Sequence, residues 1–246
     1  SGQSGLWNAD SSKRECSSIA HLLGTKAARI HTEYTANRWS AYLKNTGIRE
    51  FTGLLSCTTP PVSEHFVETQ PQDDTESLLS LVLPCVACDA DHWVNWWSPP
   101  PAVDASYPAL LHHTYEKGNV YYMAFDFFTM ATIETFRHPH SLFRDIMEME
   151  HIIPVIQNIT EIPEIIRTAY FETDEIYTVH QLSMIPKQFH GNTVPVSGGY
   201  IKIQTPVKEA KLVYPEEKAL KTTIEDGVTV IELPDFTIQQ MIVLKK

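Results

Sequence analysis

Cysteine is scarce in this chain. Its 246 residues include only four, at Cys16, Cys57, Cys85 and Cys88. A small secreted domain held together by disulfides needs more cysteines than this. The scarcity excludes a disulfide scaffold and favours a reducing compartment, so we expect a cytoplasmic protein.

Long apolar runs and an excess of basic residues are missing too. No run approaches the ~20 apolar residues of a membrane span, and the opening SGQSGLWNADSSKRE has no apolar signal-peptide core. Lys and Arg number 19 against 30 Asp and Glu, a formal net charge of −11. Nucleic acids and anionic membranes attract basic surfaces, so we expect neither as a partner. With 43% hydrophobic residues, the chain has the composition of a globular protein with a real core.

The sequence has no motif for an activated nucleophile. An amidotransferase-type enzyme carries its Cys on a G-x-C-x-G turn, with a His-x-Glu downstream. Cys16 lies instead in KRECSS, where we expect a helix, and Cys57 lies in LLSCTT. Ser4 comes closest to a G-x-S-x-G turn but has no strand before it. The acidic residues fall in solvated turns and on a helix face and define no glycosidase pair, for instance Asp73, Asp74, Glu148 and Glu150. We therefore predict no catalytic residue.

Metal-ligand spacing is absent as well. Cys85 and Cys88 form a lone C-x-x-C with His92 four residues on, whereas zinc needs further ligands and a redox pair usually opens a helix. Four more histidines lack a carboxylate or Cys at ligand spacing, namely His112, His113, His138 and His140. We expect no metal and no cofactor, and interpret these side chains as structural or surface groups.

What the chain does contain is a strongly apolar strand pair. Residues 107–128, YPALLHHTYEKGNVYYMAFDFF, form two apolar runs around a polar turn at Gly118, where we expect a positive φ. This pattern predicts a hairpin or closely connected strands. The run VYYMAF has no helical period and fits a strand buried on both faces of a sheet. We interpret Asp126, at its end, as a cap or turn residue.

Helices and further strands flank this pair. Residues 12–23 predict a short helix ended by Gly24, and residues 139–156 predict an amphipathic helix that lies on the sheet. Additional strands are expected at residues 28–34, 66–69 and 78–83. Together these elements predict a layer of strands and helices over residues 1–158, separate from the region that follows.

From about residue 160 the pattern changes to short β runs without helices. Asp226-Gly227 is the sharpest turn signal among the Gly and Pro residues that separate them. The spacing predicts a small antiparallel β-sandwich over residues 159–246. Six runs carry the prediction, at residues 161–172, 175–184, 200–204, 210–214, 228–233 and 237–244.

One loop is rich in tryptophan. The segment HWVNWW places Trp93, Trp96 and Trp97 just before three prolines. Indole rings can form a platform for the apolar face of a sugar, or anchor a subunit contact. They can equally fill the gap between two structural units. All three alternatives stay open, and these residues are the carbohydrate or interface candidates.

Several segments resemble parts of a known family. The strings SGQSGLWNADSSKRECSSIAHLLG (residues 1–24) and YPALLHHTYEKGNVYYMAF (residues 107–125) are similar to an S-G-x-S-G … D … L-x-x-L-L-G opening and to a strand pair in the C-terminal half of family 42 glycoside hydrolases, the trimerising β-galactosidases. Residues 139–156 and 175–183 resemble the helix that follows and a central strand of the sandwich. Glu116 stands where that family usually has Gly, and HQLS at residues 180–183 departs from its H-L-v-N pattern.

The resemblance implies a function as well as a fold. In that family a catalytic TIM barrel precedes an amidotransferase-like α/β domain and a small sandwich, and no barrel lies within these 246 residues. The resemblance implies that residues 1–158 form an α/β fold, an incomplete flavodoxin-like or amidotransferase-like layer, before the sandwich. It therefore implies a non-catalytic accessory and oligomerisation region, whose partner is a copy of itself or an associated catalytic barrel. The alternatives are a carbohydrate-binding module that uses Trp93, Trp96 and Trp97, and an amidotransferase-like hydrolase, which the missing Cys turn disfavours.

Overall fold

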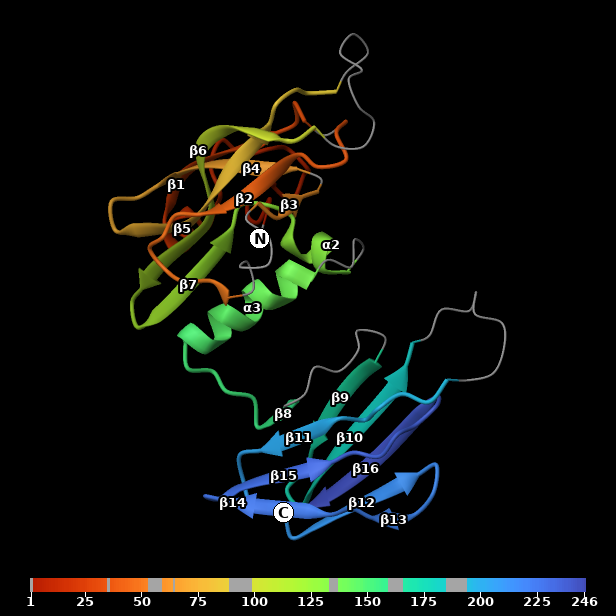
Figure 1. Ribbon diagram of the computed structural model, residues 1–246. Helices are drawn as coiled ribbons and strands as arrows, with labels where there is room; N and C mark the ends of the chain where they lie inside the picture. Colours follow the sequence, from red (N-terminus) through yellow and green to blue (C-terminus); the bar gives the residue numbers. More distant parts are fainter. Residues whose placement is uncertain are drawn as a thin grey trace. The chain divides into compact units, whose positions relative to one another are not determined.

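The computed structural model describes residues 2–34, 36–52, 59–63, 65–88, 99–132, 137–158, 166–184 and 194–246. The chain divides into two compact units, Ser1–Ile152 and Ile153–Lys246 (Figure 1). Every strand pair in the described ranges is antiparallel.

The first unit is built mainly from strands. One sheet has the order β3-β2-β5-β6-β7, and β1 and β4 form a two-stranded sheet. Its elements are α1 (Ala20–Leu23), β1 (Thr25–His31), β2 (Ala41–Asn45), β3 (Pro61–Val62), β4 (Phe66–Pro71), β5 (Thr75–Pro84), β6 (Pro101–Tyr115), β7 (Gly118–Met123), α2 (Phe127–Thr132) and α3 (Arg137–Met149).

The expected flavodoxin-like or amidotransferase-like α/β layer is wrong. The described part of this unit is an antiparallel sheet with two helices against it, not a parallel sheet with crossover helices. The apolar runs do form strands buried on both faces, but that burial does not require parallel strands. Here helices cover one face and the N-terminal segment covers the other.

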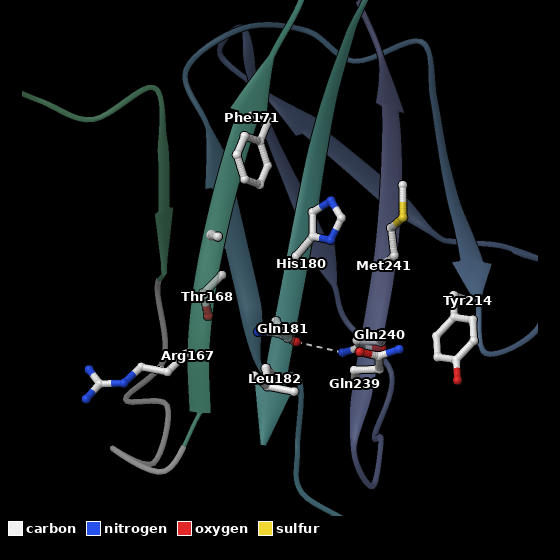
Figure 2. A pocket seen from close by; sticks show the side chains of 11 residues that line it. Arg167, Thr168, Phe171, His180, Gln181, Leu182, Tyr214, Gln239, Gln240 and Met241 are labelled. Carbon is white, nitrogen blue, oxygen red and sulfur yellow. Dashed lines mark hydrogen bonds between the residues drawn. The ribbon is translucent and has the colours of Figure 1, made fainter. Parts of the chain in front are cut away.

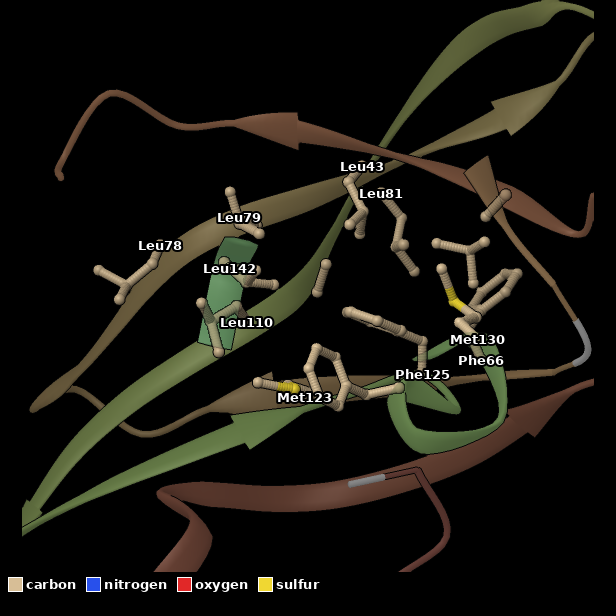
Figure 3. Packing of buried hydrophobic residues seen from close by; sticks show 14 of the residues in the cluster. Leu43, Phe66, Leu78, Leu79, Leu81, Leu110, Met123, Phe125, Met130 and Leu142 are labelled. Carbon is tan, nitrogen blue, oxygen red and sulfur yellow. The ribbon is translucent and has the colours of Figure 1, made fainter. Parts of the chain in front are cut away.

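Strand β6 lies at the centre of the packing. On one face Leu110 packs in a large cluster with residues of α2 and α3, such as Met130 and Leu142 (Figure 3). On the other face Leu111 packs with Leu23 of α1. Neighbouring residues of a strand point to opposite faces, so both faces of β6 are shielded from solvent at this point. Leu110 and Leu111 are fully buried.

The predicted hairpin is confirmed as β6 and β7, which pair from Tyr115↔Gly118 to Leu110↔Met123. The prediction for its glycine is wrong. Gly118 does not have a positive φ; the residue that does is Glu116, at 52°. The resemblance places a Gly at that position, and here a Glu takes the left-handed conformation.

The helices are shorter than predicted, and side chains explain why. Between residues 12 and 19, hydrogen bonds to a serine side chain replace the backbone bonds of a helix. Ser17 Oγ donates to the Ser4 carbonyl at 2.9 Å, and the Ile19 N–H donates to Ser17 Oγ at 3.3 Å. Only Ala20–Leu23 is helical, so Cys16 lies outside a helix. Gly24 ends α1 in the left-handed conformation, as predicted.

Helix α3 begins near the predicted start but ends at Met149. His151 takes a φ of 54°, its N–H donates to Glu148, and the Ile152 N–H donates to the Met147 carbonyl. This is a Schellman termination with a histidine where Gly is usual. None of the helices in the described residues has the length and apolar character needed to cross a lipid bilayer.

The second unit consists of two antiparallel sheets with an apolar cluster between them. The sheet orders are β13-β12-β16-β10-β9 and β14-β15-β11-β8. Each of the six predicted β runs overlaps a strand in its described residues, with residues 161–165 of the first run outside them. Asp226 and Gly227, both at positive φ, make the turn between β14 and β15. The strands are β8 (Ile156–Asn158), β9 (Ile166–Glu172), β10 (Ile176–Ser183), β11 (Tyr200–Ile203), β12 (Glu209–Tyr214), β13 (Lys218–Ala219), β14 (Thr222–Glu225), β15 (Val228–Glu232) and β16 (Gln239–Lys245).

Two glycines at positive φ provide a matched test of the packing around α1. A Cβ on Gly24 would lie 2.2 Å from Thr75 Oγ1 and 2.7 Å from His113 Cβ, whereas a Cβ on Gly47 would meet nothing within 4 Å. Both substitutions by Ala carry left-handed strain of roughly 1 kcal/mol, and only Gly24→Ala adds overpacking of roughly 1–3 kcal/mol.

We therefore predict that Gly24→Ala lowers the free energy of unfolding clearly more than Gly47→Ala does. All five tryptophans lie within residues 1–97, so urea unfolding followed by Trp fluorescence reports on the first unit. Equal losses in the two variants would contradict the packing described for Gly24.

Candidate functional site

The sequence-predicted tryptophans cannot be placed. Trp93, Trp96 and Trp97 fall in residues 89–98, outside the described residues, as does His92. Their role in carbohydrate or subunit binding stays a prediction.

The Cys85–Cys88 segment is held as a loop. The Asn37 side chain accepts the Cys88 N–H at 2.6 Å and donates to the Val86 carbonyl at 3.1 Å. Cys85 is exposed, Cys88 is buried and Cys16 is partly buried. Residues 85–88 are not helical, whereas a redox-active C-x-x-C usually lies in the first turn of a helix.

The predicted histidines are distributed among separate environments. His113 is buried beside Thr75, with Nδ1 3.3 Å from its hydroxyl. His138 lies in α3, where burial lowers its pKa to about 4. His140 Nε2 donates to the Ala131 carbonyl at 3.2 Å. Across the described ranges no three His, Cys, Asp or Glu side chains gather as a metal site would require.

His112 belongs to a polar network at one end of the hairpin. Its Nδ1 lies 2.9 Å from Glu76 Oε2, and its Nε2 lies 3.1 Å from Asn119 Oδ1. Asn119 Nδ2 and the Tyr121 hydroxyl both donate to the Glu150 carboxylate, at 2.7 and 2.5 Å. The network thus joins β5, β6 and β7 to the residue just after α3.

The network stabilises the charged form of both carboxylates. The hydrogen bond from His112 lowers the pKa of Glu76, with further help from the nearby Arg49 guanidinium. The hydrogen bonds from Tyr121 and then Asn119 lower the pKa of Glu150. Burial, followed by the hydrogen bond to Glu150, raises the pKa of Tyr121. A carboxylate held ionised by donors suits a structural clamp better than it suits a general acid.

The carboxylate of Glu68 also contacts a buried side chain, that of His31. His31 is buried in β1, stacks on Phe66 at 4.6 Å, and places Nε2 3.1 Å from Glu68 Oε1. Tyr107 lies nearby, and burial, then the charge of Glu68, raises the pKa of its hydroxyl. This cluster connects the β1–β4 sheet to β6.

The second unit carries a hollow of about 620 Å³ on one sheet. Residues of β9, β10 and β16, together with Tyr214 at the end of β12, line it, and Figure 2 shows their side chains across the strands. The face toward the other sheet is apolar, with Val179 and Ile242 fully buried in the sandwich core. The hollow therefore belongs to the outward face, on which His180 and Met241 alternate with those core residues.

Strand register arranges the lining in rows. His180 pairs with Ala169 on one side and with Met241 on the other, and Tyr214 pairs with Met241. In the neighbouring row Leu182 pairs with Arg167 and with Gln239. The small Ala169 side chain leaves a depression in the first row.

Two aromatic rings stand at the border of the hollow. Phe171 is 61% exposed and Tyr214 is 48% exposed. The ring of Phe171 meets the imidazole of His180 edge-on, with centroids 5.4 Å apart. Within the described part of the chain, the side chains of Arg167, Gln239 and Tyr214 make no hydrogen bond. The arrangement can bind a ligand that has both an apolar face and polar substituents.

Sequence reasoning missed this site. Its signal is large side chains at the outward positions of sandwich strands, where polar residues are usual. Phe171 and Leu182 show it plainly, but their neighbours across the sheet follow only from register.

Comparison with known proteins identifies structural neighbours. No protein-family model and no curated protein matches the sequence. Among solved structures, α-L-fucosidase isoenzyme 2 of Paenibacillus thiaminolyticus matches with a TM-score of 0.63 at 15% identity, over 84% of this chain and 32% of that one. A cold-adapted β-galactosidase of Rahnella sp. R3 matches with 0.56 at 13% identity (100% and 28%). Gan42B, a family 42 β-galactosidase of G. stearothermophilus, matches with 0.54 at 11% identity (98% and 27%).

The structural neighbours are thus glycoside hydrolases, and this chain spans a third or less of their length. At such identities the likeness shows the fold alone. Two of these neighbours are β-galactosidases, the class of enzyme that the sequence segments resemble.

The pKa shifts predict how stability depends on pH. Glu76 and Glu150 have lowered pKa values in the folded protein. Their stabilisation is therefore present above the unfolded value of about 4.3 and is lost as the pH falls through the lower folded values. We expect the free energy of unfolding to decrease below about pH 4.

Tyr121→Phe removes one donor to Glu150. It should lower stability at pH 7 by about 1 kcal/mol and make the loss at acid pH shallower. Chemical denaturation between pH 3 and 7 measures both effects, with Tyr115→Phe in the same hairpin as the control. Parallel pH profiles for the two variants would show that the network does not hold Glu150 ionised.

Proposed function

We propose that this chain is a non-catalytic accessory region of a glycoside hydrolase. The supporting observation is the asymmetry of the structural matches: the β-galactosidase folds cover 98–100% of this chain, which in turn covers only 27–28% of theirs. A region that accounts for about a quarter of a hydrolase leaves most of the enzyme for a separate catalytic part.

The carboxylates described above support the same conclusion. A glycosidase needs two carboxyl groups that face a shared substrate site, one of them with a raised pKa. Glu76 and Glu150 have lowered pKa values and act within one hydrogen-bonded network. Glu68 contacts the buried His31. Each of these groups has a structural role: Glu68 in β4, Glu76 in β5, and Glu150 just after α3.

We further propose that the region works beside a catalytic barrel or in contact with copies of itself. Phe128 in α2 and Phe143 in α3 are 61% and 48% exposed, which provides apolar area for a protein contact. The expected amidotransferase-like layer is not the fold of this unit, so it gives no reason to propose a trimer rather than another oligomer. The small number of cysteines favours a reducing compartment, and we propose the cytoplasm as the location of the protein.

Hydrolysis assays test the proposal. We predict that the purified 246-residue chain releases no product from chromogenic β-D-galactosides or α-L-fucosides, whereas the full gene product hydrolyses one of them. In the full product, Glu76→Gln and Glu150→Gln should leave kcat within about twofold, because neither group takes part in the chemistry.

Turnover by the isolated chain that Glu76→Gln or Glu150→Gln abolishes would overturn the non-catalytic role. A full gene product that contains no glycosidase activity would overturn the link to a glycoside hydrolase. Light scattering on the chain tests association separately: a monomeric mass would leave the catalytic part as its partner.

A further inference from the structure

We propose that the hollow on the outward face of the β9–β10–β16–β12 sheet is a carbohydrate-binding site. The ligand class is a neutral short oligosaccharide, bound along the row Ala169, His180, Met241 and Tyr214. The choice of carbohydrate rests in part on the proposed function, whereas the existence of a binding site rests on the geometry.

The dimensions of the hollow fit a small ligand. Its volume of about 620 Å³ lies within the roughly 300–1,000 Å³ typical of ligand pockets. The row crosses four strands, and adjacent strands lie ~4.8 Å apart, so its length is ~14 Å.

The aromatic side chains provide surfaces for the apolar side of a sugar ring. Phe171 stands at the β9 end and Tyr214 at the β12 end (Figure 2). Their exposed rings cost free energy in water that a stacked pyranose would recover. Between them, His180 and Met241 form a floor that is partly apolar.

The polar side chains provide partners for hydroxyl groups. Arg167 has guanidinium donors, Gln239 has both a donor and an acceptor, and Tyr214 has a hydroxyl that can do either. None of the three makes a hydrogen bond to another described residue. Sugar hydroxyls need this mixture of donors and acceptors, whereas an anionic ligand would need more than the single cation Arg167.

A buried glutamine pair holds the floor in place. Gln181 Oε1 accepts a hydrogen bond from Gln240 Nε2 at 2.6 Å, and Gln181 Nε2 donates to the Gly198 carbonyl at 3.0 Å. Both residues are at least 98% buried, and both line the hollow. Gln240 Oε1 accepts no hydrogen bond from the described residues. The side chains of the pair alternate with His180 and Met241 and point toward the sandwich core, so the pair fixes β10 against β16 beneath the floor of the hollow.

Binding by the full 246-residue chain tests the site. The probe is a glycan array that carries neutral and anionic oligosaccharides, followed by titration calorimetry with the neutral glycan retained best. We expect binding that Phe171→Ala and Tyr214→Ala each weaken about tenfold, a loss of about 1.4 kcal/mol for one stacked ring. Both side chains are exposed, so the variants should keep the thermal midpoint of the parent chain.

Two control variants locate the binding. Tyr200→Ala removes a partly exposed tyrosine from β11, in the other sheet of the same sandwich, and should leave affinity unchanged. Trp96→Ala removes the alternative platform and should also leave it unchanged. Loss of binding in Trp96→Ala but not in Phe171→Ala would overturn the proposal. A glycan array on which the chain binds no neutral glycan would overturn it too. Self-association that Phe171→Ala abolishes, without glycan binding, would assign the face to a second copy instead.

The outcomes stay separate from those of the hydrolysis assays. Glycan binding at the hollow by a chain whose full gene product hydrolyses nothing would support this site and overturn the proposed function. Hydrolysis by the full gene product, with no glycan bound by the chain, would support the proposed function and overturn this binding site.

Discussion

The first unit depends on the burial of strand β6 on both faces. Leu110 faces the cluster with α2 and α3, while Leu111, next to it, faces α1. Exposure of either apolar face to water would cost free energy, so other elements must pack on both sides of β6. The helices provide one cover. The N-terminal segment provides the other: the Gly2 N–H donates to the Met123 carbonyl, and the Tyr122 hydroxyl donates to the Gly2 carbonyl.

The same constraint explains what could be predicted from the sequence and what could not. A strand buried on both faces needs a continuous apolar run. Such runs locate most of β7, the C-terminal part of β5 and the middle of β6, which extends from Pro101 to Tyr115. Strand direction is a different matter, because a strand buried on both faces occurs in parallel and in antiparallel sheets. One local signal does decide it: only Glu116 and Lys117 separate β6 from β7, and a parallel connection needs a dozen residues or more. Similarity to an α/β family outweighed that signal and led to the wrong fold class.

The candidate site was hidden from the sequence for another reason. Apolar alternation locates β9, β10 and β16, but a hollow depends on which residues lie opposite one another. Phe171 and Tyr214 are 43 positions apart and belong to strands that are not neighbours. Between Leu212 and Tyr214 the register of β12 against β16 shifts, which places Tyr214 opposite Met241. No periodicity in the sequence reports such a shift.

The two units differ in how they use their polar side chains, and this difference bears on function. In the first unit Glu76 and Glu68 make contacts that join one strand to another, and the hydrogen bonds of Glu150 join β7 to the end of α3. A group that already stabilises the fold in its charged form gains little from meeting a substrate. On the hollow of the second unit, Arg167 and Gln239 have no such commitment within the described residues. The exposed rings of Phe171 and Tyr214 gain free energy when they leave water, and Arg167 and Gln239 can exchange water for ligand hydroxyl groups, so this face is suited to binding.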